Sequence, residues 1–68
     1  MDVKYNKLWK LLIDKKMKKT DLIKVVGITS NIVAKLSKGE FISMESLKKI
    51  CISLDCDIQD ILELNFKD

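Results

Sequence analysis

Histidine, arginine and proline are absent from this chain of 68 residues, and glycine and cysteine occur only twice each. Without histidine the chain lacks the commonest general base and metal ligand, so we expect neither an enzyme nor a metal protein. A structural zinc site takes about four Cys or His ligands, which Cys51 and Cys56 alone cannot supply. Two buried, reduced thiols are the expected alternative.

Long hydrophobic runs are also missing. The apolar stretches Leu11 to Ile13 and Ile50 to Leu54 fall far short of the ~18 apolar residues of a membrane span, and no signal-peptide pattern opens the chain. With 34% charged and 47% hydrophobic residues, the composition excludes a disordered or linker-like chain. We expect one soluble, cytoplasmic domain over residues 1–68, with residues 64–68 as a short tail.

Apolar residues at helical spacing predict a first helix over Asn6 to Lys16. Leu11 and Ile13 widen its apolar arc to about 200°, more than a surface helix requires, so the helix is either central or uses one flank for a partner. Trp9 could serve as a stacking platform, but its place within the apolar stripe favours the core. The residues that define the stripe are Tyr5, Leu8, Trp9 and Leu12.

Two further helices follow, joined by about three residues as in a helix-turn-helix. The first, Lys18 to Val26, ends at Gly27, which is suited to a C-terminal cap and a tight turn. Lys18 has no capping hydroxyl, so Thr20 is a rival start for this helix. The next helix, Ser30 to Lys38, has Thr29 as its N-cap and Gly39 just beyond its end. Its apolar face holds Ile32, Val33 and Leu36, and its opposite face Ser30, Asn31, Ala34, Lys35 and Lys38.

The last third of the chain predicts two more helices. Ser43 is suited to cap a fourth helix, and Asp57 a short fifth one. The expected inward residues are Met44, Leu47, Ile50, Cys51 and Leu54, then Ile58, Ile61 and Leu62. Because no strand pattern is present, the predicted fold is all-α, a compact five-helix bundle that contains a helix-turn-helix.

Charge is distributed unevenly along the chain. Residues 1–39 hold ten lysines against three aspartates, which gives +7, whereas residues 40–68 hold three lysines against seven acidic residues, which gives −4. A positive half points to a polyanion such as nucleic acid, although exposed lysines can also be simply solvated.

The stretch from Met17 to Leu62 resembles the Cro/repressor-type, or Xre-like, helix-turn-helix DNA-binding domains, and in particular their small single-domain bacterial members. The residues that carry the resemblance are Leu22, Gly27, Ile28, Thr29, Val33, Leu36, Gly39, Leu47, Ile50, Leu54 and the ending CDIQDILEL. The resemblance implies a regulator that binds duplex DNA, with Lys18 to Val26 as the supporting helix and Ser30 to Lys38 as the recognition helix. We expect no cofactor, and no small-molecule ligand is evident from the sequence.

Matching positions in the family imply specific roles here. Ser30, Asn31 and Lys35 match positions that touch base edges, Thr29 lies at the entry to the same helix, and Lys19 and Lys38 match phosphate-contacting positions. Lys18 is expected to contact phosphate as well, because helix N-termini attract phosphate and lysine adds a mobile charge. Side-chain chemistry agrees, because Asn31 can pair with adenine, Lys35 can donate to guanine, and Ala34 can contact the thymine methyl group. The family often has Gln at the position of Lys19 and Glu at that of Ser37, and the lack of arginine removes the bidentate guanine contact.

A protein-protein interaction module is the alternative, for example an antitoxin that acts through its acidic, apolar C-terminal half. Ile52, Leu64 and Phe66 are candidate exposed residues there, unless the tail folds over Ile52. The same residues are candidates for the interface of a homodimer, which we expect at least on DNA, because a core of this size supplies little stability. A salt-sensitive shift of labelled duplex DNA separates DNA binding from the alternative.

Overall fold

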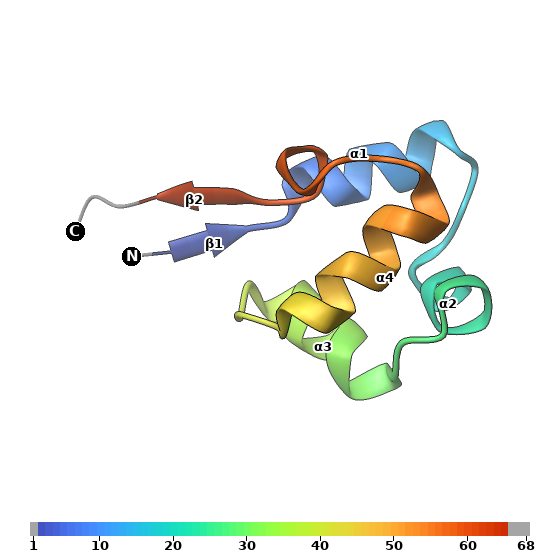
Figure 1. Cartoon of the computed structure of the whole chain (residues 1–68), viewed down its shortest axis with the longest axis horizontal. Coiled ribbons are helices and arrows are strands. Elements are labelled where there is room, and N and C mark those ends of the chain that lie inside the picture. The colour runs from blue at the N-terminus through green and yellow to red at the C-terminus, as the bar shows by residue number, and fades with distance from the viewer. Residues whose placement is uncertain (1, 66–68) are drawn as a thin grey trace.

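The computed structural model describes residues 2–65. Within them lie the helices α1 (Asn6–Asp14), α2 (Lys19–Asp21), α3 (Ser30–Lys38) and α4 (Met44–Leu54), the π-helix η1 (Leu22–Val26), the 3-10 turn η2 (Ile58–Asp60) and the strands β1 (Asp2–Lys4) and β2 (Glu63–Asn65). Figure 1 shows these helices gathered into one body from which the paired strands extend.

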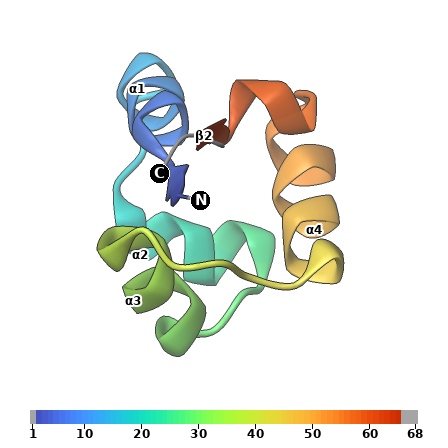
Figure 2. The same ribbon diagram turned by 90° about the vertical axis from the view of Figure 1, so that its left-hand side faces the viewer.

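The helices surround one core. Figure 2 shows α1 and α4 facing each other, with α2, η1 and α3 closing one end of the body. Each of the α1, η1, α3 and α4 segments places a fully buried apolar residue in this core, and the segment after η2 adds another. These residues are Leu8, Leu22, Leu36, Ile50 and Ile61. The helix-turn-helix is therefore anchored from both of its helices.

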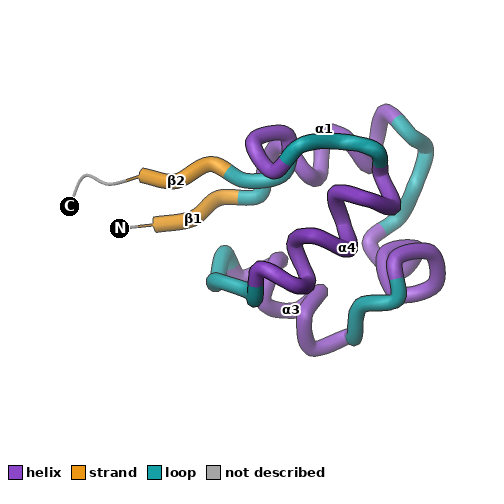
Figure 3. Tube along the Cα trace, in the orientation of Figure 1, coloured by secondary structure: helices purple, strands orange, loops and turns teal. Residues whose placement is uncertain are grey.

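The fold is mostly helical and contains the expected helix-turn-helix, but it is not all-α, because β1 and β2 form a two-stranded antiparallel sheet (Figure 3). Val3 lies opposite Leu64 in this ribbon, and Lys4 lies opposite Glu63. A strand of three residues is too short to show the alternating pattern that predicts strands. Its stability depends on the pairing of distant segments and on packing, since Val3 is buried in the core.

The predicted fifth helix is only the single turn η2, so the described part of the chain is not a five-helix bundle. The Asp60 carboxylate accepts a hydrogen bond from the Asp57 backbone N–H at 3.1 Å, which satisfies the start of the turn. The Ile61 N–H then bonds the Ile58 carbonyl at 3.0 Å in the tighter 3-10 pattern. Ile61 is buried, but Ile58 is partly exposed, so the expected inward face is only half formed.

Other boundaries differ by a few residues. The first helix ends at Asp14, and Lys16 beyond it adopts a left-handed backbone with φ of 58°. The supporting helix begins at Lys19 with Lys18 as its N-cap, and the Asp21 carboxylate accepts the Lys18 backbone N–H at 2.8 Å. Thr20 therefore lies inside α2.

Met44 was expected in the core, but its side chain is 70% exposed.

Candidate nucleic-acid interface

The turn between η1 and α3 sets the position of α3. Gly27 ends η1 in the left-handed region with φ of 86°, and its N–H bonds the Leu22 carbonyl at 3.2 Å. The buried Ile28 then fixes the turn to the core. Thr29 caps α3, because its Oγ1 accepts the Ile32 N–H at 3.2 Å. The N-terminus of α3 is thus held by one buried side chain and one cap.

The helix α3 has a buried and an exposed face, as its sequence predicts. Leu36 is fully buried, and Ile32 and Val33 are half-buried against the core. The predicted base-contacting residues are all exposed, namely Thr29, Ser30, Asn31, Ala34 and Lys35. The structure therefore brings hydroxyl, amide, methyl and ammonium groups together on one solvent-facing surface, which we call the α3 face.

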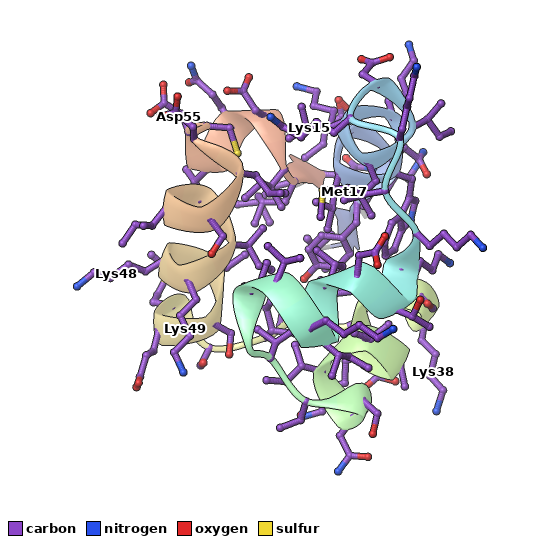
Figure 4. All side chains as sticks on the ribbon, turned by 90° about the vertical axis from the view of Figure 1, so that its right-hand side faces the viewer. Lys15, Met17, Lys38, Lys48, Lys49 and Asp55 are labelled. Carbon is purple, nitrogen blue, oxygen red and sulfur yellow. The ribbon has the colours of Figure 1, made fainter. Side chains whose placement is uncertain are left out.

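The three predicted phosphate-contacting lysines are also exposed, and Lys19 contacts α3 through Ser37. Lys18 and Lys19 lie at the start of α2, and Lys38 is the last residue of α3. Figure 4 shows Lys38 extending from α3 on the opposite side of the view from Lys48 and Lys49 of α4. The two lysines of α4 therefore lie apart from Lys38.

Lys19 makes two contacts that the sequence does not reveal. Its Nζ donates a hydrogen bond to the Ser37 hydroxyl at 3.2 Å and lies 4.2 Å from the centre of the Trp9 ring. The ring is half-buried, so the expectation that Trp9 is a core residue holds only in part. No local pattern could have predicted this cluster, because its members come from α1, α2 and α3.

The C-terminal end of α3 is tied to the beginning of the chain. Gly39 follows α3 with φ of 74°, and the buried Tyr5 donates its hydroxyl to the Glu40 carbonyl at 2.7 Å. Burial raises the pKa of Tyr5, so this hydroxyl keeps its proton well above neutral pH. Both ends of α3 are thus fixed before any ligand is bound.

The residues expected at a protein–protein interface lie on different elements of the fold. Ile52 lies on α4 and is 68% exposed, and Leu64 lies in β2 and is 42% exposed. Phe66 lies outside the described residues. Leu64 therefore does not cover Ile52, and each side chain is open to a partner.

Among residues 2–65, no group of three or more Cys, Asp or Glu side chains is placed to hold a metal ion. Cys51 and Cys56 are free thiols, and burial is the main cause of the raised pKa of each. None of the described helices is long and apolar enough to cross a membrane.

Comparison with known proteins shows which family has this arrangement of helices. A family model described as a Cro/C1-type helix-turn-helix DNA-binding domain matches residues 7–67. The chain belongs to the Cro/C1-type helix-turn-helix family. The Cro/C1-type match runs from α1 through α4 and so includes the turn at Gly27 and the whole of α3. The resemblance read from the sequence is confirmed.

A solved structure gives the same result for the fold. The crystal structure of the transcriptional regulator VanUg (Form II) is 52% identical in sequence and superposes with a TM-score of 0.88. The alignment covers 91% of this chain and 83% of that one. No curated protein matches the chain. The Cro/C1-type domain described here is therefore a DNA-binding domain that is similar to a known transcriptional regulator.

Proposed function

We propose that this chain regulates transcription by binding a specific duplex DNA sequence with α3 in the major groove. The observation that carries the proposal is the α3 face, which is exposed and polar on a helix fixed at both ends. The major groove of B-DNA admits a helix and displays a distinct donor and acceptor pattern for each base pair. Because DNA is the partner, we expect the protein to act in the cytoplasm.

In this proposal, residues in the middle of the α3 face contact the base edges. The amide of Asn31 can bond adenine N6 and N7 together, and the ammonium of Lys35, one turn later, can donate to guanine O6 or N7. Ala34 offers its methyl group to thymine, while the hydroxyl of Ser30 can bond either a base or the backbone. With no arginine in the chain, the guanine contact from α3 is assigned to Lys35, because Lys38 is assigned to a phosphate.

Phosphate contacts supply most of the affinity in this proposal. Lys18 and Lys19 flank the groove on the side of α2, and Lys38 flanks it at the end of α3. About three phosphate contacts per subunit, or six in a dimer, give a slope near −5 when the logarithm of affinity is plotted against that of salt concentration. A slope near zero would refute phosphate binding by these lysines.

The decisive experiment is selection of bound sequences from a random duplex pool, followed by Asn31→Ala. The variant should lose about 1 to 3 kcal/mol of binding free energy at one base pair and relax the preference there. Lys48→Ala is the matched control, because Lys48 is exposed on α4 away from Lys38 and should leave affinity within error. An equal loss for Asn31→Ala on every DNA sequence would refute base readout by Asn31.

We also propose that the protein binds DNA as a symmetric dimer. One recognition helix reads only a few base pairs, so useful selectivity requires two half-sites about 34 Å apart on one face of the duplex. Exposed Ile52 and Leu64 support an interface in the C-terminal half, to which Phe66 would contribute, leaving the α3 face free. Sedimentation with and without a palindromic duplex tests this. One-to-one binding by a protein that stays monomeric at high concentration would refute the dimer.

A further inference from the structure

The ammonium group of Lys19 lies where three helices meet. Trp9 of α1 supplies the ring beneath it, 4.2 Å from Nζ, and Ser37 of α3 accepts its hydrogen bond at 3.2 Å. Lys19 itself stands in the first turn of α2. An exposed lysine normally samples many rotamers, but these two contacts define one position for its charge.

We propose that Trp9 is a positioning residue for DNA binding, which holds the Lys19 ammonium in place for a DNA phosphate. The inference deepens the proposed function and rests on it. Trp9 belongs to α1, outside the helix-turn-helix, and touches no DNA in this account. Its ring acts through Lys19 alone.

The chemistry of the ammonium leaves a hydrogen free for this task. A lysine ammonium has three N–H donors and no acceptor. The Ser37 hydroxyl takes one donor, and the electron-rich face of the Trp9 ring attracts the charge without taking a directed bond. At least one N–H of Lys19 therefore remains for a phosphate oxygen. Trp is also the aromatic residue that attracts a cation most strongly.

The position of Trp9 on α1 allows this role alongside its packing against the core. Leu8 and Leu12 are the residues of α1 buried in the core, whereas Trp9 is half-buried at the flank of the same helix. Together with Leu12, Ile13 and Met17, the Trp9 and Lys19 side chains line a surface hollow of about 170 Å³. The ring therefore spans the boundary between the core and the surface that carries Lys19.

Fixing Lys19 in the free protein lowers the entropy that binding must remove. A lysine side chain is among those that lose most rotamer freedom when they are ordered. If Trp9 and Ser37 order the Lys19 side chain in the free protein, the phosphate contact forms with a smaller loss of rotamer entropy. We expect loss of the ring to weaken DNA binding about two- to fivefold, the range that corresponds to an exposed cation–π contact.

A double-mutant cycle on the selected duplex tests the inference. Trp9→Leu should weaken binding two- to fivefold in the wild type, and Trp9→Phe should restore part of the affinity because it keeps an aromatic ring. In a Lys19→Met background, Trp9→Leu should have no further effect. In a Lys18→Met background it should keep its full effect, because Lys18 is not the lysine over the ring.

A DNA-free measurement separates this inference from the proposed function. The ε-methylene protons of Lys19 should be shifted upfield by the Trp9 ring in the NMR spectrum of the free protein, and Trp9→Leu should remove that shift. If the wild type binds no selected duplex, the proposed function fails and the positioning role fails with it. If the wild type binds but Trp9→Leu has the same effect with and without Lys19, only the positioning role is overturned. Urea denaturation of each variant checks that it is folded at the assay temperature.

Discussion

Replacing Gly27 by alanine isolates the energetic cost of the turn that orients α3. The backbone of Gly27 is left-handed, with φ of 86°, and a Cβ built at this position meets no heavy atom within 4 Å. Steric clash with neighbours therefore contributes nothing. A left-handed conformation disfavours an L residue by about 1 to 2 kcal/mol. Alanine also lowers the entropy of the unfolded chain, which stabilises the folded state by about 0.4 to 1 kcal/mol.

The net expectation for Gly27→Ala is a loss of about 1 kcal/mol in the free energy of unfolding. In a domain of this size such a loss lowers the melting temperature by about 4 to 8 °C. Urea denaturation followed by far-UV circular dichroism should show a lower midpoint with an unchanged slope. Gly27→Asn is the matched control, because asparagine tolerates the left-handed region and should lose less.

Gly39 provides a second comparison at the other end of α3. Its φ is 74°, and a Cβ there would lie 3.4 Å from the Val3 carbonyl oxygen, which is an ordinary contact. Gly39→Ala should therefore lose a similar amount. A Gly27→Ala protein that is as stable as the wild type, or more stable, would refute the argument from backbone conformation. So would a larger loss for Gly27→Asn than for Gly27→Ala.

Two further predictions concern side chains outside the α3 face. Tyr5→Phe removes the hydroxyl that donates to the Glu40 carbonyl and should lower the free energy of unfolding by about 1 to 2 kcal/mol, measured by the urea midpoint; an unchanged midpoint would contradict the role given to this bond. Burial raises the pKa of the Cys51 and Cys56 thiols, so the folded state holds these protons more tightly than the unfolded state. Stability should therefore be fully present below the ordinary thiol value of 9.0 and fall as pH rises above it. A variant with both cysteines replaced by alanine should lose this part of the pH dependence, and identical profiles for the two proteins would show the idea to be wrong.

The parts of the fold that the sequence predicts well are those determined by neighbours along the chain. The helix α3 runs from Ser30 to Lys38 as predicted, because the hydroxyl of Thr29 and the left-handed Gly39 mark its two ends locally. The apolar and polar faces of α3 follow from the same short stretch. The predicted base-contacting residues are therefore all exposed, although their contacts with DNA remain predictions.

The features that the sequence does not predict depend on contacts between distant segments. The pairing of Val3 with Leu64 has no local signal, since either strand alone is a short, ordinary peptide. Trp9 was assigned to the core because its spacing matches the buried stripe, but its flank position leaves the ring available to Lys19. Such positions are determined by tertiary packing, which the local sequence pattern does not report.

The ribbon of β1 and β2 has a consequence for the order in which the molecule assembles and opens. The helices α2, η1 and α3 contact one another within a short length of chain, whereas the ribbon joins segments from opposite ends of it. Closing so long a loop is slow compared with forming local contacts. The helix-turn-helix can therefore form before the ends meet, and local unfolding should begin where the ends separate. Backbone amides of β1 should exchange with solvent hydrogen sooner than those of α3, so the surface proposed to read DNA belongs to the last part of the protein to open.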